Sequence, residues 1–114
     1  MLSPERREQI DYQAHSEVSE YFWSIIYYDD QRGCFVYCGV PGHEEPVDWD
    51  AELEGFLEQT REEREEFEDA LANGQKPEPT WWEITKDPEA NEFYRAAYLH
   101  YFQTFCENAK RYSA

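Results

Sequence analysis

Basic side chains are scarce in this chain of 114 residues, which has ten Lys and Arg against 26 Asp and Glu and a formal net charge of −16. Proteins that bind DNA, RNA or anionic membranes neutralise phosphates with Lys and Arg. The shortage of bases therefore excludes direct binding to nucleic acid or to an anionic membrane surface. It favours cationic partners, such as the basic surface of another protein.

Long apolar runs are also missing. No run reaches the ~18–20 residues of a transmembrane helix, and residues 1–8, MLSPERRE, lack the apolar stretch of a signal peptide. We therefore expect a cytoplasmic protein. Its three cysteines, Cys34, Cys38 and Cys106, are an odd number for a disulfide framework, and we expect them to be reduced.

Aromatic residues, in contrast, are abundant: four Trp, nine Tyr and seven Phe. A disordered acidic chain would lack them, so we expect a folded protein. The length suits one hydrophobic core and is too short for two ordinary domains. We expect a single acidic domain over residues 1–114. Since the aromatic content exceeds the need of one small core, a homodimer is a further option.

The first third of the chain predicts a helix followed by a β-hairpin. Ser3, Pro4 and Glu5 are typical of a helix start, and apolar residues at helical spacing extend the helix over about 4–20. Segments 21–28 and 34–38 are rich in aromatic and β-branched residues and flank the turn-type pentapeptide 29–33, which predicts a hairpin with a five-residue loop. The alternative continues the first helix through residue 28 and gives an all-α bundle.

The rest of the chain predicts two further helices. After a loop over 39–46, Asp48 is a good N-cap for a helix that ends near Ala72, before Asn73 and Gly74. Its apolar residues fall within about 100° of arc, as in a core-facing stripe. They are Trp49, Leu53, Phe56, Leu57, Phe67 and Leu71. A turn or linker over 75–80 and a short strand or irregular segment over 81–84 follow.

Asp87 predicts the start of the last helix, which begins at Pro88. Its expected buried stripe is Tyr94, Tyr98, Tyr101, Phe102, Phe105, Ala109 and Tyr112. The predicted architecture is therefore an α+β domain with the order helix, β-hairpin, long acidic helix, helix.

The negative charge is concentrated in the middle of the chain, where residues 41–80 hold 14 acids and three bases. Five acids follow one another opposite the apolar stripe of the long helix, at an axial spacing of ~4.5–6 Å. They are Glu54, Glu58, Glu62, Glu65 and Asp69, here called the acidic row. Glu44, Glu45 and Asp50 extend the negative field at the helix start, and only Arg61 and Arg64 interrupt the row.

A ridge of carboxylates at this spacing is an electrostatic substitute for a phosphate backbone. The sequence therefore predicts a nucleic-acid mimic that blocks the basic groove of a DNA- or RNA-binding protein, with the acidic row, Glu44, Glu45 and Asp50 as contacts. In size, charge and helical acid rows the chain resembles the anti-restriction and anti-CRISPR proteins of phages and mobile elements. No motif matches a particular family.

Two other interpretations remain open. One is an immunity or antitoxin protein that plugs the active site of a basic nuclease toxin. The other is a scaffold or interaction module whose acidic face only keeps it in solution, since most charge runs are solvated surfaces. Like the nucleic-acid mimic, neither of these two proteins would be an enzyme.

Neither catalysis nor a metal is predicted. Cys34, Cys38 and His43 form a C-x3-C-x4-H pattern that is no recognised zinc-site spacing, and buried apolar cysteines are the simpler interpretation. Nucleophile-elbow, phosphate-loop and H-E-x-x-H motifs are all absent, and His100 lies away from the apolar stripe. We expect no cofactor. The sequence does not separate a core position from an interface position for Trp81 and Trp82.

Overall fold

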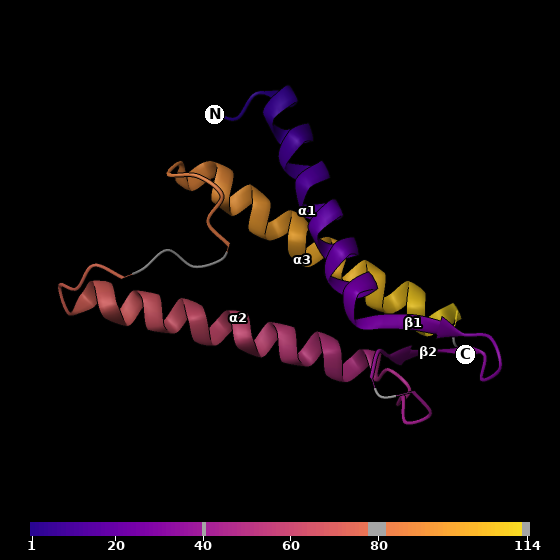
Figure 1. Ribbon diagram of the computed structural model, residues 1–114. Coiled ribbons are helices and arrows are strands. Elements are labelled where there is room, and N and C mark those ends of the chain that lie inside the picture. Colours follow the sequence, from indigo (N-terminus) through magenta and orange to yellow (C-terminus); the bar gives the residue numbers. More distant parts are fainter. Residues whose placement is uncertain (40, 78–81, 113–114) are drawn as a thin grey trace.

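The protein has three helices and one two-stranded antiparallel hairpin, seen in a computed structural model that describes residues 1–39, 41–77 and 82–112 (Figure 1). The elements in chain order are α1 (Pro4–Ile25), β1 (Ile26–Asp29), β2 (Cys34–Tyr37), α2 (Trp49–Ala72) and α3 (Pro88–Tyr112). The α+β class predicted from the sequence is confirmed, and the all-α alternative is not favoured.

Each helix begins where the sequence predicts, because a side chain accepts a backbone N–H that has no partner within the helix. The Ser3 hydroxyl accepts from Arg6 N at 3.1 Å, and the Asp48 carboxylate accepts from Ala51 N at 3.1 Å. The Asp87 carboxylate accepts from Glu89 N at 3.0 Å. At the end of α2, Gly74 adopts a φ of +71°, as a left-handed helix cap requires.

The hairpin is shorter than predicted, because α1 continues to Ile25. Residues 21–25 are helical and β1 begins at Ile26, so the strand prediction was wrong over 21–25 and is confirmed over 26–28. Phe22, which is fully buried, continues the buried stripe of Ile10, Ala14 and Val18. The burial of this stripe against α3 outweighs the β-propensity of its aromatic neighbours. Asp29 pairs with Cys34, which leaves a four-residue connection that ends in Gly33 at φ +69°.

The core is an aromatic cluster at the point where α1, α2 and α3 meet. Helices α1 and α3 cross while both run toward the hairpin, and α2 leads away from it (Figure 1). The ring of Phe22 stacks on Phe105 at a centroid distance of 4.3 Å and an angle of 8°, and it lies 4.8 Å from Phe102 and 5.6 Å from Trp49. These rings join all three helices.

Tyrosines add polar links between the elements. Tyr101 donates to Asp11 at 2.6 Å, and Tyr94 donates to Glu17, so α3 is hydrogen-bonded to α1 at two places. Beside the hairpin, Val47 N donates to the Phe35 carbonyl at 2.9 Å, and Pro46 forms a bridge with Val36. The end of the predicted 39–46 loop and the residue after it therefore pair with β2. This pairing fixes where α2 begins.

The far half of α2 is poorly covered. Only Trp49 and Phe56 of this helix are buried, while the side chains of Leu57 and Leu71 are 39% and 55% exposed. The prediction of a fully core-facing stripe on α2 was therefore wrong beyond its first turns, and Tyr112 of the α3 stripe is exposed as well. The radius of gyration is 16.9 Å, against about 13 Å for a compact chain of this length. The molecule is extended because α2 projects from the aromatic cluster.

Trp82 belongs to the core. Its side chain is 9% exposed and packs on Phe56 at a centroid distance of 5.9 Å, and its indole N–H donates to Glu63 at 2.9 Å. The described part of the segment predicted as a strand or irregular, residues 82–84, is irregular. The question about Trp81 lies outside the described residues.

We predict that Phe22→Ala lowers the free energy of unfolding by about 3–5 kcal/mol, because it removes a fully buried ring from the centre of the cluster. Urea denaturation followed by circular dichroism measures the change. Tyr12→Ala is the control, because Tyr12 is 74% exposed on the same helix and should change the stability by no more than about 0.5 kcal/mol. Equal losses in the two variants would contradict the central position of Phe22.

We also predict that the fold weakens in alkali. Burial raises the pKa of Cys106 to about 12 and that of Tyr98 to about 12, whereas in an unfolded chain a thiol titrates near ~8.5 and a phenol near ~10. Because folding holds both groups neutral, their contribution is complete below about pH 8.5 and is lost as the pH rises toward 12. Urea denaturation should show a falling stability of at most about 1.4 kcal/mol per pH unit for each group.

Cys106→Val tests the contribution of the thiol. This variant should move the start of the alkaline decline from about pH 8.5 to about pH 10, where phenol ionisation takes over. Cys38→Ser, at an exposed cysteine, is the control and should leave the start unchanged. A decline that begins at the same pH in all three proteins would contradict the assignment to Cys106.

Candidate partner-binding site

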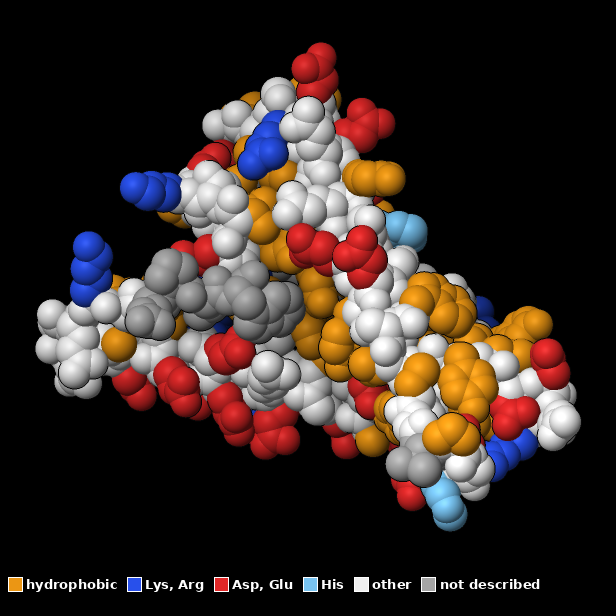
Figure 2. Space-filling model, viewed as in Figure 1, with side chains coloured by type: hydrophobic (Ala, Val, Ile, Leu, Met, Phe, Trp, Pro, Cys, Tyr) orange, Lys and Arg blue, Asp and Glu red, His pale blue; other side chains and the backbone are white. Residues whose placement is uncertain are grey.

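The acidic row lies on the outer face of α2. All five of its side chains are exposed, and Figure 2 shows acidic side chains along the edge of α2 that faces away from α1 and α3. From Glu54 to Asp69 the helix rises by roughly 22 Å. Because an α-helix is a stiff support, the carboxylates are held in one line.

Few cations compensate the row. In the described part of the chain, its one ion pair within 4.0 Å joins Glu58 to Arg61 at 3.8 Å, between two exposed side chains. Such a pair contributes little in water. Arg64 does not interrupt the row, contrary to the sequence prediction, because it lies on the opposite side of α2 and faces α3. Four carboxylates of the row are thus open to solvent and to an incoming cationic surface.

The three outlying acids are placed differently. Asp50 lies in the first turn of α2 and is bound by Lys110 of α3, whose Nζ contacts its two oxygens at 2.9 and 3.0 Å. Glu44 accepts a hydrogen bond from Gly42 N at 3.0 Å, and backbone hydrogen bonds lower the pKa of its carboxyl. Glu45 is exposed beside it. Asp50 and Glu44 therefore already have partners within the chain, in contrast to most of the row.

The cysteines and histidines do not gather. Cys106 is buried, Cys34 is half-buried and Cys38 is exposed, so the prediction of buried cysteines was wrong for Cys38. His43 and His100 are both exposed, as was expected for His100. Over residues 1–39, 41–77 and 82–112, no group of three or more His, Cys, Asp or Glu side chains is arranged to hold a metal ion.

Exposed aromatic side chains gather near the hairpin, where Figure 2 shows a cluster of hydrophobic side chains. Trp23 is 56% exposed and lies 6.0 Å from the ring of Phe35, and Tyr112 is 68% exposed and lies 5.2 Å from Tyr28. Tyr27 is also exposed. The sequence left open whether Trp81 and Trp82 are core or interface residues, and Trp82 is a core residue. Trp23 was missed because residues 21–25 were assigned to a strand, and Tyr112 was missed because it was assigned to the buried stripe of α3.

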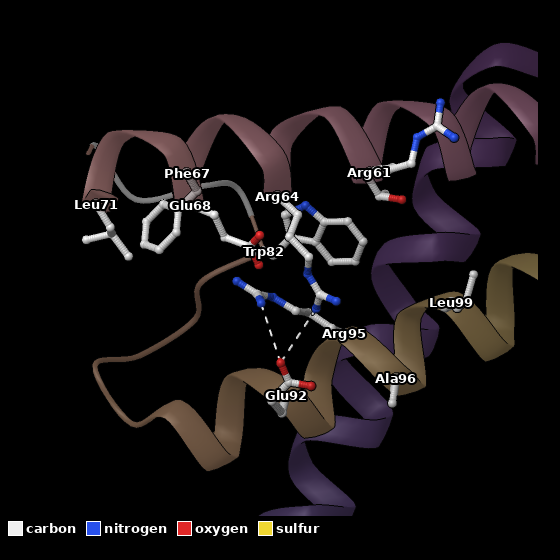
Figure 3. A pocket seen from close by; sticks show the side chains of 11 residues that line it. Arg61, Arg64, Phe67, Glu68, Leu71, Trp82, Glu92, Arg95, Ala96 and Leu99 are labelled. Carbon is white, nitrogen blue, oxygen red and sulfur yellow. Dashed lines mark ion pairs between the residues drawn. The ribbon is translucent and has the colours of Figure 1, made fainter. Parts of the chain in front are cut away.

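A groove lies between α2 and α3, and the sequence did not reveal it. It encloses about 770 Å³. We call it the arginine groove; six of its lining residues are Arg64, Phe67, Leu71, Trp82, Arg95 and Leu99. Figure 3 shows Arg64 and Arg95 reaching from the two helices toward Glu92. The position of Arg64 around the helix axis could have revealed the groove. At about 100° per residue, Arg64 falls inside the apolar arc of α2 and not within the acidic row.

Comparison with known proteins gives no match: no protein family, no curated protein and no solved structure matches this chain. None of the helices in the described residues is both long enough and apolar enough to cross a lipid bilayer. The functional argument therefore depends on the chain's own geometry.

The acidic row should cost folding stability. Glu62 lies one helical turn from Glu58 and Glu66 and three residues before Glu65, and like-charge pairs at these spacings destabilise a helix by ~0.2–0.5 kcal/mol each. We predict that Glu62→Lys raises the free energy of unfolding by about 1 kcal/mol at roughly 20 mM salt. At roughly 500 mM salt most of this gain should disappear.

Asp30→Lys is the matched control, because it changes the net charge equally in the exposed hairpin connection, outside any helix. Urea denaturation of both variants at the two salt concentrations separates the local repulsion from the effect of net charge. An equal gain in both variants would assign the effect to net charge alone and contradict local repulsion along the row.

Proposed function

We propose that this protein is a non-enzymatic inhibitor that imitates nucleic acid and occupies the basic groove of a DNA- or RNA-binding protein in the cytoplasm. The observation that carries the proposal is the acidic row: five exposed carboxylates on one face of α2, of which four have no ion pair within the described residues. Anti-restriction and anti-CRISPR inhibitors are the functional class to which such a surface is suited.

The dimensions of the row support this proposal. Its length of roughly 22 Å corresponds to the rise of six or seven base pairs at 3.4 Å each. The carboxylates are held on a helix, so little conformational entropy is lost when they meet Lys and Arg of a partner. Long-range attraction then accelerates association and makes it dependent on salt. Glu45 and the exposed rings near the hairpin would supply further contacts at one end of the row.

The described residues offer little for catalysis. The most buried thiol, that of Cys106, has a raised pKa and lies in the aromatic core, which suppresses the thiolate that a nucleophile requires. Cys38 and His43 are exposed side chains of the loop after β2. The carboxylates of the row are exposed on one helix face and lack the enclosed site in which a catalytic pair of carboxylates works. A binding function accounts for these features better than a reaction does.

A variant in which Glu54, Glu58, Glu62 and Glu65 are all changed to Lys should lose its partner, because the surface that imitates phosphates becomes cationic. We would capture partners with the tagged protein from a nuclease-treated lysate at roughly 50 mM and 500 mM salt and identify them by mass spectrometry. We expect a nucleic-acid-binding protein at low salt, displaced by added DNA or RNA and absent with the variant.

The matched control reverses four exposed acids outside the row, Glu8, Glu20, Asp30 and Glu107. Both variants have the same net charge, so only the row variant should lose the partner, while circular dichroism confirms that both fold. A single nuclease toxin captured from the same cell would favour an immunity protein. Two results would contradict mimicry: retained binding by the row variant, or a partner that added DNA or RNA does not displace. Either result would mean that the row is only a solvated surface.

A further inference from the structure

The arginine groove presents apolar surface that no described element covers. Leu71 is 55% exposed, and Phe67 and Leu99 are half-buried along the same hollow. The groove extends along α2 from Thr60 to Leu71, a rise of roughly 16 Å or three helical turns. A helix of three turns that presents apolar side chains at i, i+4 and i+7 has the dimensions to lie between α2 and α3.

Around this apolar surface the bases outnumber the acids, although the chain is strongly acidic: Arg61, Arg64 and Arg95 line the groove with Glu68 and Glu92. Arg64 of α2 and Arg95 of α3 both approach the same carboxylate oxygen of Glu92 at 3.6 Å (Figure 3). That distance is too long for a hydrogen bond. Glu92 is 69% exposed, so it holds the two guanidinium groups by weak ionic contacts only. An incoming carboxylate that hydrogen-bonds to them would make the stronger interaction.

Arg95 carries a second indication. Its guanidinium carbon lies 5.8 Å from the ring centroid of Trp82, which fixes the group over an aromatic surface. Its Nε is buried and donates to no atom in the part of the chain that the structure describes. A buried donor without an acceptor is costly. Nε itself is closed to a ligand from solvent, so an incoming carboxylate would bind the Nη groups of Arg95, one of which already approaches Glu92 at 3.6 Å.

We propose that the arginine groove binds an amphipathic helix of a partner protein, with leucine or aromatic side chains against Phe67, Leu71 and Leu99 and an Asp or Glu between Arg64 and Arg95. This site is independent of the acidic row, which lies on the other face of α2 and suits a cationic partner. A second copy of the chain is the less suitable occupant, because it would bring another formal charge of −16 into contact.

A displayed library of amphipathic helices tests the proposal. Peptides of about 15 residues, long enough for three turns with flanks, would vary at the apolar positions and at the positions beside them. Selection on the folded protein at about 150 mM salt, with counter-selection on Arg64→Glu, isolates peptides specific for the groove. We expect enrichment of Leu, Phe or Trp at i, i+4 and i+7 with Asp or Glu beside them.

Fluorescence anisotropy then measures the affinity of the selected peptides. Arg64→Glu and Leu71→Ser should each weaken binding at least tenfold, and both positions are exposed, so the fold should survive. Arg7→Glu, an equal charge change at an exposed position of α1, should leave the affinity unchanged. The variant with four Lys in the acidic row should still bind the selected peptides. Loss of the nucleic-acid mimic would therefore leave the groove proposal intact, and the two proposals can fail separately.

Three results would overturn the proposal. They are an absence of enriched sequences, enrichment of Lys and Arg beside the apolar residues, and an affinity unaffected by Leu71→Ser, the groove variant that takes no part in the selection. Sedimentation equilibrium adds a fourth: a dimer that Leu71→Ser dissociates would show that a second copy occupies the groove.

Discussion

The packing of Phe22 against Phe102, Phe105 and Trp49 is the contact on which the rest of this structure depends. It is the place where all three helices meet, and the hairpin closes beside it. Aromatic rings suit this task because each buries a large area and fixes the orientation of its neighbours. The chain has a small core, so a few rings must provide most of the burial that offsets both conformational entropy and charge repulsion.

The position of this cluster explains why α2 has two different exposed faces. The cluster holds α2 through its first residues, Trp49 and Phe56, and farther along the described contacts are Trp82 with Glu63 and Arg64 with Glu92. The helix therefore projects from the core. One face carries the acidic row into solvent, where repulsion is screened and weakened. The opposite face approaches α3 without filling the space between them, and the arginine groove results.

The sequence predicted local features well, because caps and turns depend on neighbouring residues. Ser3, Asp48 and Gly74 all act as expected. It failed where the outcome depends on contacts between distant segments. Residues 21–25 have strand-forming side chains, but the burial of Phe22 against α3 keeps them helical. Periodicity identified Leu71 as apolar-facing without revealing that nothing described covers it, since a pattern specifies which face is apolar and not what lies opposite.

The two surfaces also differ in how far the sequence predicts them and in the distance over which each would act on a partner. The acidic row was visible from the sequence because its members belong to one helix, and its field extends over about one Debye length, ~8–10 Å at moderate salt. The arginine groove needs Arg64 and Arg95 from separate helices and acts only at contact distance, since the surrounding acids cancel its charge at longer range. The row would therefore control how fast a partner approaches, whereas the groove would control which helix stays bound once it has arrived.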